Sequence, residues 1–429
     1  MMNKSINLYR IEKSFLSSLI IYSLFSWYID ANNIIPDYNL TPYVLVFFLL
    51  YAMIIGFLSK FVFNRFALVW LPFITLIMMN ILLRYRLGIS TALQLVIGFI
   101  FLLTISANML TIKKSINILK VISIFFAITV IFHYLFPSIH MIFIKYLLNP
   151  ESYRIVESLM NRGFYAGLSS QTGHIAAYLS IGIGLFFVFA NKFNKRRVIF
   201  IGTIFVIALL LTGKRAHFLF SIVAFAITML ISSKQKVNTA MKILFLTIII
   251  AGVLTIMGPY LNPLTGVGRV YDSFAKILMG SKIDDVNDIT SGRLDLFQEA
   301  WLVFKQNIWN GIGWGYYGFS EEVVSEYTVH NVYLNILAEL GIPGLIFYLI
   351  PLLWLIKQNI KLLKIYKNTS QLNLLKFTLY CQIFYLLYNF TGNPLYNFNY
   401  LFLYLYSIFI LFKLYKNRNI ASSINLKAY

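Results

Sequence analysis

A short stretch around His330 combines side chains that could act on a substrate. It reads VHNVYLNILAELG and contains His330, Asn331, Asn335 and Glu339. The spacing of four residues between the two amides and the carboxylate places all three on one face of a helix. The imidazole of His330 has an ordinary pKa of about 6.5, which suits removal of a proton from a hydroxyl group near neutral pH. The sequence therefore predicts a general base at His330, at the start of a helix with a polar face.

Three cations elsewhere in the chain could meet an anionic substrate. Lys214 and Arg215 lie in the tight turn of LLLTGKRAHFLF, and Arg293 lies in SGRLDLF. A guanidinium group presents a planar fork of donors that matches a phosphate group. Arg293 also stands near a predicted helix start, where backbone N–H groups favour anions. The alternative for Lys214 and Arg215 is that they reach out to lipid headgroups, and the residues alone leave both possibilities open.

Arg162 is a further candidate for substrate binding, in the stretch NRGFYAGLSSQTGH. Gln171 and His174 follow it at the mouth of an apolar segment, although His174, like His217, fits an interfacial or packed position equally well. The five histidines and the single cysteine, Cys381, are too scattered to suggest a metal cluster, and metalloprotease and phosphate-loop motifs are absent. The sequence therefore predicts a site without metal or cofactor, in which arginines meet any diphosphate.

The elements that carry these residues are predicted to lie in a membrane. The chain has 429 residues, of which 59% are hydrophobic and 12% are charged, whereas soluble domains average roughly 25% charged residues. Repeated apolar runs are long enough to cross a hydrocarbon core of about 30 Å. The fold class is therefore predicted as all-α, a polytopic membrane protein with about twelve transmembrane helices. The predicted spans are 15–29, 42–58, 66–83, 90–111, 117–136, 173–190, 198–212, 217–232, 243–260, 343–356, 372–391 and 396–412.

The distribution of charge predicts the orientation. With the N-terminus in the cytoplasm, 24 of the 36 basic residues fall in inner segments, and Glu12 is the single acidic residue there. This follows the positive-inside rule, with Arg84 and Arg86 as exceptions, and it accounts for the net charge of +21 without nucleic-acid binding. Both termini are then cytoplasmic.

Three regions follow from this topology. Residues 1–260 would hold transmembrane helices one to nine with an outer loop at 137–172, residues 261–342 a large outer loop with short helices, and residues 343–429 the last three transmembrane helices and a cytoplasmic C-terminus.

The large outer loop is predicted to contain two short helices. The first covers 293–305 with Ser291 as its cap, and the second covers about 329–340, ended by Gly341, with Pro343 in the first turn of the next helix. Between them lies a stretch rich in glycine and aromatic residues, which fits either an interfacial belt or a surface that stacks on sugar rings.

Three motifs in order now resemble a known family. They are TGKRAHF, SGRLDLFQEAWLVFKQNIWNGIGWGYYGF and VHNVYLNILAELGIPGLIFYLI. Together they are similar to the O-antigen polymerase and O-antigen ligase superfamily, bacterial membrane glycosyltransferases with a large periplasmic loop. The resemblance implies that Arg215 and Arg293 bind the pyrophosphate of an undecaprenyl-linked glycan donor and that His330 activates the acceptor hydroxyl. It also implies an inner-membrane location with a periplasmic active site. The further substrate-binding candidates are Arg162, Lys214, Gln171, Asn331 and Glu339.

The predicted reaction is an inverting, single-displacement transfer, because a retaining route needs a carboxylate nucleophile and no motif demands one. The favoured function is a polymerase that joins lipid-linked repeat units, with the donor and acceptor glycolipids, membrane lipids and a chain-length regulator as partners. A ligase that moves the glycan to lipid A–core is the alternative. A lipid-linked glycan transporter is a third possibility, disfavoured because the predicted spans are nearly free of charge at their centres and show no repeat.

Overall fold

In a computed structural model of the chain, the structure describes residues 10–11, 13–18, 41–59, 65–83, 88–104, 109–189, 195–242, 244–245, 293–317 and 329–418, with the single residues 252, 268 and 271. Every regular element in these ranges is a helix. The helices are α2 (Thr41–Ser59), α3 (Arg65–Leu68), α4 (Leu71–Leu83), α5 (Ile89–Thr104), α6 (Met109–Leu135), α7 (Pro137–Leu147), α8 (Pro150–Asn161), α9 (Thr172–Phe189), α10 (Lys195–Leu211), α11 (Arg215–Ser232), α15 (Leu294–Gln306), α16 (Val332–Ile365), α17 (Leu372–Tyr388) and α18 (Phe398–Lys416).

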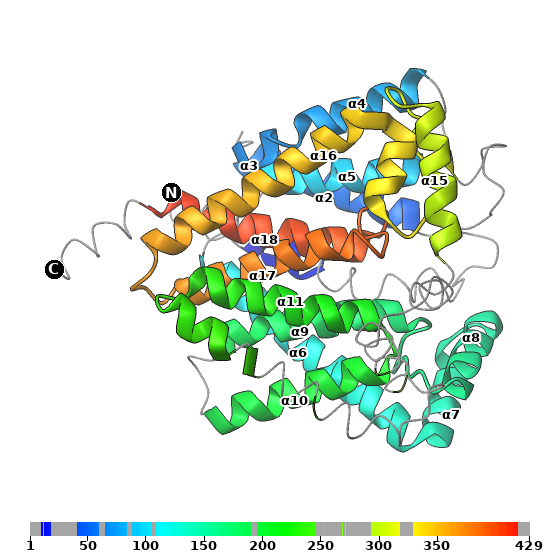
Figure 1. The fold of residues 1–429 in the computed structure, drawn as a ribbon, viewed down its shortest axis with the longest axis vertical. Helices are drawn as coiled ribbons and strands as arrows, with labels where there is room; N and C mark the ends of the chain where they lie inside the picture. Colours follow the sequence, from blue (N-terminus) through cyan, green and yellow to red (C-terminus); the bar gives the residue numbers. More distant parts are fainter. Residues whose placement is uncertain are drawn as a thin grey trace.

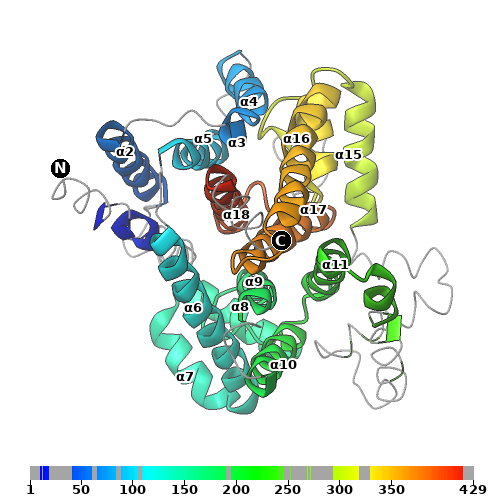
Figure 2. The ribbon, with the colours of Figure 1, turned by 90° about the vertical axis from the view of Figure 1, so that its left-hand side faces the viewer.

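The centre of the bundle is formed by α9, α17 and α18, with the other long helices around them (Figure 2). α17 packs against α9, α11, α16 and α18, and most of its residues are buried on all sides. A helix that is apolar all round is expected in the interior of such a bundle. The long helices run side by side between two ends of the molecule, and α7, α8 and α15 lie at the end opposite the last turns of α16 and α18 (Figure 1).

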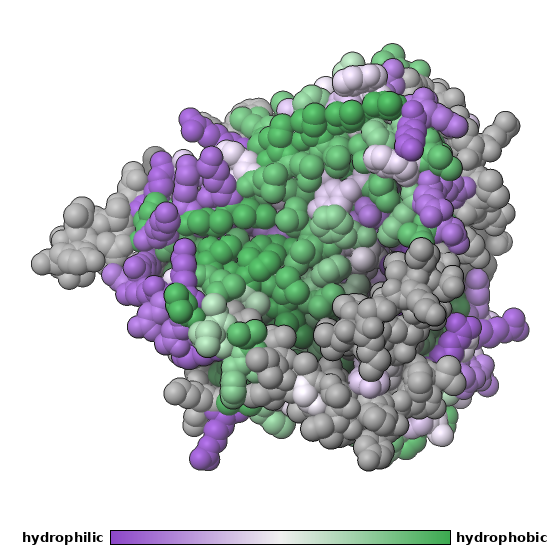
Figure 3. Space-filling view, in the orientation of Figure 1, coloured by the Kyte–Doolittle hydropathy of each residue, from purple (hydrophilic) through white to green (hydrophobic). Residues whose placement is uncertain are grey.

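The surface agrees with a membrane protein. One face shows a broad apolar band between α4 and α11, with hydrophilic residues gathered at the two ends (Figure 3). In the described residues three helices are long and apolar enough to cross a membrane, Thr111–Leu135, Arg215–Ser232 and Val332–Ile365. Shorter apolar helices accompany them, among them Leu71–Leu83 and Thr172–Val188.

Several predicted elements differ from the observed ones. The predicted span 66–83 is interrupted, because α3 ends at Leu68 and α4 begins at Leu71. The outer loop 137–172 holds α7 and α8. The N-cap of α15 is Arg293 rather than Ser291, which lies outside the described residues, as do most of the predicted spans 15–29 and 243–260.

The predicted break at Gly341 is confirmed. Gly341 has φ 65° and ψ −162° between two helical stretches of α16. The segment before the break is hydrogen-bonded through its backbone to the stretch that follows α15. Ile312 N donates to Ala338 O at 2.9 Å, and Gly313 N donates to Glu339 O at 3.0 Å. Ile342 N, just past the break, donates to Ile308 O at 2.9 Å. The break therefore lets two chain segments approach each other through their backbones.

We predict that Gly341→Ala destabilises the protein. A residue other than glycine is strained at positive φ, and a side-chain carbon there would meet the backbone of Ile308 and Trp309. The expected loss is on the order of 1–3 kcal/mol, measured as a lower midpoint of thermal unfolding in detergent.

Gly252→Ala is the matched control for this substitution. Gly252 is helical, and an added carbon there meets nothing within 4 Å. The control should be neutral or slightly stabilising. Equal midpoints for the two variants would show that the break at Gly341 does not require glycine.

Candidate functional site

The turn that follows α17 holds two of the predicted site residues at one place. Arg293, at the start of α15, donates from Nη1 to the carbonyl oxygen of Thr391 at 2.7 Å. Val332, at the start of α16, donates its backbone N–H to the carbonyl oxygen of Asn389 at 2.9 Å. Because His330 lies two residues before Val332, the turn at 389–391 brings Arg293 and His330 to the same end of the bundle.

The starts of α9, α11 and α18 meet on the other side of the same region. A side-chain carbon added at Gly173, in the first turn of α9, would come within 3.8 Å of Lys214 Cε. The hydroxyl group of Tyr400, in the first turn of α18, donates to Gly173 O at 2.7 Å. Since that hydroxyl proton is used, the contact of 2.8 Å between His217 Nε2 and the Tyr400 oxygen requires a proton on Nε2. His217 is 2% exposed, so it is a packed residue that fixes these three helix starts.

The charges of Arg293 on one side of this region and of Lys214 on the other both act on His330. Partial burial, together with the nearby charges of Arg293 and Lys214, lowers the pKa of His330 to about 4. The imidazole is therefore neutral at pH 7 and has a lone pair with which to accept a proton. Lys214 is also within electrostatic reach of His174 and His217. We name the group formed by Lys214, Arg293 and His330 the cation–imidazole cluster.

The two cations of the cation–imidazole cluster occupy unusual helix positions. Lys214 is the N-cap of α11 and Arg293 is the N-cap of α15, and neither makes a side-chain cap. Lysine and arginine have only donors, so they cannot accept from the first N–H groups of a helix as serine or aspartate would. They also add positive charge at the positive end of the helix dipole. This arrangement is unfavourable by itself and becomes favourable when an anion lies at both helix starts.

The backbone at His330 is strained. Its φ is 52°, and it is the one non-glycine residue with positive φ in the ranges that the structure covers. Such a conformation costs on the order of 1–3 kcal/mol and persists where the surroundings impose it. Asn331, the next residue, is the N-cap of α16, and its Oδ1 accepts from Tyr333 N at 3.0 Å and from Leu334 N at 3.1 Å. The predicted binding residue Asn331 thus has a structural role as the cap of α16.

Glu339 is placed away from the cluster, in a network of its own. It is 2% exposed, and its Oε2 accepts from the hydroxyl group of Tyr396 at 3.0 Å. The backbone N–H groups of Gly315 and Tyr317 and the side chain of Asn335 also bond to the carboxylate. Glu339 therefore fastens the glycine- and aromatic-rich stretch to α16.

Trp314 in that stretch is also buried. It is 1% exposed and lies against Tyr396 with ring centroids 5.1 Å apart. Its backbone N–H donates to Asn80 Oδ1 at 2.9 Å and its indole N–H donates to Thr91 Oγ1 at 3.2 Å. Trp314 thus presents no face on which a sugar ring could stack, and it belongs to the interior instead of to an interfacial belt.

The remaining predicted residues have less defined places. Arg215 is the first residue of α11 and is partly buried beside Lys214. Gln171 is exposed just before α9 and its backbone bonds to Ser169 Oγ. Arg162 is exposed at the C-terminal end of α8. The contacts that the structure gives do not join Arg162 or Gln171 to the cation–imidazole cluster.

The turn at 389–391 and Tyr400 were not expected from the sequence. The run NFTGNP at 389–394 is rich in turn residues between two apolar segments, and this signal could have placed a loop on the outer side. Nothing in it indicates that its carbonyl groups receive Arg293. Within the described ranges, no three side chains of His, Cys, Asp or Glu come together as metal ligands would.

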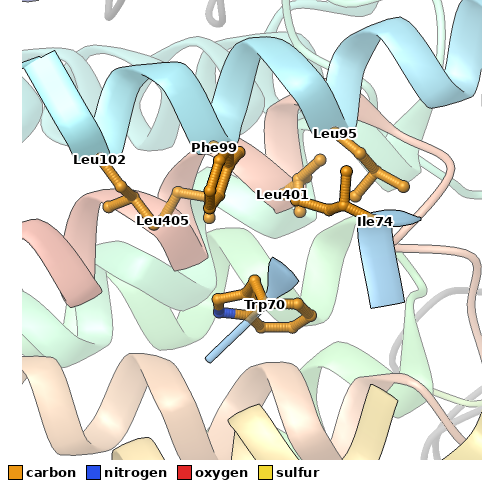
Figure 4. Close-up of a pocket in the computed structure, with 7 residues that line it drawn as sticks. All are labelled: Trp70, Ile74, Leu95, Phe99, Leu102, Leu401 and Leu405. Atoms are coloured by element: carbon orange, nitrogen blue, oxygen red, sulfur yellow. The ribbon is translucent and has the colours of Figure 1, made fainter. Parts of the chain in front are cut away.

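A pocket elsewhere in the bundle has no ionisable side chain in its lining. It lies between α4, α5 and α18 (Figure 4) and is lined by Trp70, Ile74, Leu95, Phe99, Leu102, Leu401 and Leu405. The lining is apolar apart from the indole N–H of Trp70, so the pocket can hold hydrocarbon and has no ionisable side chain with which to transfer a proton.

Comparison with known proteins gives a match over the part of the chain that contains the cluster. Residues 200–349 match the sequence profile of a family described as O-antigen ligase. The matched segment covers about a third of the chain and contains Lys214, Arg293 and His330. No curated protein matches the chain. The family comprises membrane glycosyltransferase-like enzymes, polymerases and ligases, that act on lipid-linked glycans. Residues 200–349 of this membrane protein are thus similar to the O-antigen ligase family, which supports the resemblance that the three sequence motifs predict.

Proposed function

We propose that the protein is an O-antigen polymerase that joins undecaprenyl-pyrophosphate-linked oligosaccharide repeat units. The transfer is inverting and metal-independent, and it takes place on the periplasmic side of the bacterial inner membrane. The observation that carries this proposal is the cation–imidazole cluster, in which two cations at helix starts surround a neutral histidine.

The cations hold the pyrophosphate of the donor. A phosphate charge about 4 Å from a guanidinium group is worth roughly 4 kcal/mol at an effective dielectric constant near 20. Arg293 is pre-positioned by its bond to Thr391 O, so little of this energy is lost in ordering the side chain. Lys214, and Arg215 beside it, supply the second contact, and the uncapped starts of α11 and α15 add backbone donors.

His330 takes the proton from the acceptor hydroxyl. The acceptor oxygen forms a bond to C1 of the donor sugar, the bond from C1 to the phosphate oxygen breaks, and undecaprenyl pyrophosphate leaves with its negative charge against the cations. The bound pyrophosphate offsets the charges of Arg293 and Lys214. Because these charges lower the pKa of His330 in the free protein, donor binding raises that pKa and makes the imidazole a stronger base when it is needed.

The inverting course is supported by the position of Glu339. Its carboxylate is engaged by Tyr396 and by the backbone of the glycine-rich stretch. A double displacement would need a carboxylate free to attack the sugar. The description of the matched family as O-antigen ligase favours a second candidate, transfer of finished glycan to lipid A–core by the same residues.

We predict that purified protein in liposomes lengthens a lipid-linked single repeat unit into a ladder of products on a gel. A polymerase uses this molecule both as donor and as acceptor, whereas a ligase leaves it unlengthened until lipid A–core is added. A product found only with lipid A–core would contradict the polymerase proposal and support the ligase. No product under either condition would contradict both proposed functions.

We predict that His330→Asn and His330→Ala both abolish turnover. Asparagine tolerates positive φ better than alanine, so His330→Asn keeps the backbone conformation and removes the basic nitrogen. Its thermal midpoint and donor affinity should match those of the parent, while His330→Ala should be less stable. Turnover by the asparagine variant at the parental rate would show that His330 is not the base.

We predict that Lys214→Ser stabilises the free protein and weakens donor binding. A serine at the N-cap can accept from the first helix N–H groups, which is worth about 1 kcal/mol, and it removes a cation from the dipole end. The measurements are the thermal midpoint and the affinity for the lipid-linked donor. Lys361→Ser, which removes an exposed lysine of α16, is the control and should change neither.

The same Lys214→Ser variant should alter the pH dependence of activity. Loss of a neighbouring cation raises the pKa of His330 from about 4, so the acid limb of kcat/KM should move to higher pH. An unchanged acid limb would show that Lys214 does not influence the pKa of the catalytic base.

A further inference from the structure

Helix α7 has an apolar face that no other part of the described structure covers. Ile139, Ile142, Phe143 and Tyr146 are 48%, 60%, 57% and 84% exposed. Their spacing of three and four residues places them on one side of the helix. The opposite side, which includes His140, Met141 and Ile144, is buried, and the last two pack in a cluster with Val156 of α8. α7 is therefore apolar on two faces, and one of them remains open.

The open face of α7 continues a stripe that begins on α6. Val121, Phe125, Ile128 and Phe132 are exposed on α6 at the same helical spacing. α6 is one of the helices apolar and long enough to cross a membrane, so this stripe is its lipid-facing side. We name these four residues of α6 and the residues Ile139, Ile142, Phe143 and Tyr146 of α7 together the apolar stripe.

The apolar stripe is too long for a straight span. From Val121 to Tyr146 a continuous helix would measure about 39 Å at 1.5 Å per residue, and the hydrocarbon core is about 30 Å thick. α6 already extends further, to the exposed Lys113 and Lys114, at its other end. The helix is broken at Phe136, where φ is −132° and ψ is 61°, and Pro137 opens α7. The break allows α7 to turn away from the direction of α6.

Helix α8 shows the contrasting pattern. Its buried side holds Ser152 and Val156, and its open side carries the exposed Glu151, Arg154 and Glu157. A polar open face is suited to water. The two helices thus differ in what their open sides can contact, although they are consecutive and packed together.

We propose that α7 lies in the headgroup and acyl boundary of the outer leaflet, with the apolar stripe as its lipid contact. The partner is lipid because the stripe is continuous with the lipid-facing side of α6 and carries no charge among its members. Lys145 and Tyr146 next to its end are residues that reach from apolar surface to headgroups. A helix with one face in lipid and the other on a water-facing partner is typical of interfacial attachment.

The position of α7 is transmitted to the cation–imidazole cluster by two contacts. His140 Nε2 lies 2.8 Å from the carbonyl oxygen of Gly167, in the loop after α8. Tyr165 N of the same loop donates to Leu211 O at 3.1 Å, three residues before Lys214. These two contacts connect α7, through the loop after α8, to the last residue of α10, three residues before Lys214.

Site-directed spin labelling in proteoliposomes tests this proposal without any assay of glycosyl transfer, so its failure would be independent of the proposed function. In a Cys381→Ala background, one label replaces Ile142 on the stripe and a matched label replaces Glu157 on α8. Both sites are exposed, so neither substitution removes a packing contact. Accessibility is measured to oxygen, which partitions into lipid, and to a water-soluble nickel chelate.

We expect the ratio of oxygen to nickel accessibility to be several-fold higher at position 142 than at position 157. Equal ratios would place α7 in water and overturn the proposal. A label at position 142 shielded from both reagents would also overturn it, and would show that a protein surface, such as a second copy of the chain, covers the stripe.

Discussion

The candidate site depends on two positive charges at helix starts, where positive charge is unfavourable. Lys214 and Arg293 each stand at the start of a helix, where a hydrogen-bond acceptor or a negative charge would be the stabilising choice. Burial, together with their repulsion of a proton, keeps His330 neutral in the free protein. In the function proposed above, the same charges attract a pyrophosphate, and the bound pyrophosphate relieves the repulsion. Under that proposal, binding of the anion and activation of the base follow from one electrostatic arrangement.

The two cations repel each other, so the helices that carry them must be held in fixed positions. Contacts within the bundle, many of them to backbone groups, do this. The carbonyl groups of the turn at 389–391 receive Arg293 and the start of α16. The break at Gly341 lets the stretch after α15 pair with α16, and Glu339 fastens that stretch from inside. Tyr400 and His217 fix the starts of α9 and α11. These contacts are buried or partly buried, so they are strengthened by the lower dielectric of the interior.

The arrangement of the helices also suits a membrane. Central helices α9, α17 and α18 are buried by protein, and the outer helices present apolar residues to lipid (Figures 2 and 3). α15 crosses the end of the bundle where the cluster lies (Figure 1). A charged diphosphate on a lipid anchor has its phosphates at the membrane surface and its tail in the hydrocarbon, which matches a cationic site at the end of an apolar bundle.

The sequence by itself determined the helical class, the membrane setting, the break at Gly341 and the similarity to the O-antigen ligase family, because apolar run length, glycine and the three motifs are local signals. It also singled out Arg293 and His330 from their residue types and positions near helix starts. Tertiary structure alone decided that Lys214 faces His330, that Glu339 serves the glycine-rich stretch and that Trp314 is buried. A side chain at a membrane rim can point to lipid, to water or to protein, and the choice depends on which distant segments pack beside it. The carbonyl group that receives Arg293 lies 98 residues further along the chain, and no spacing rule connects the two.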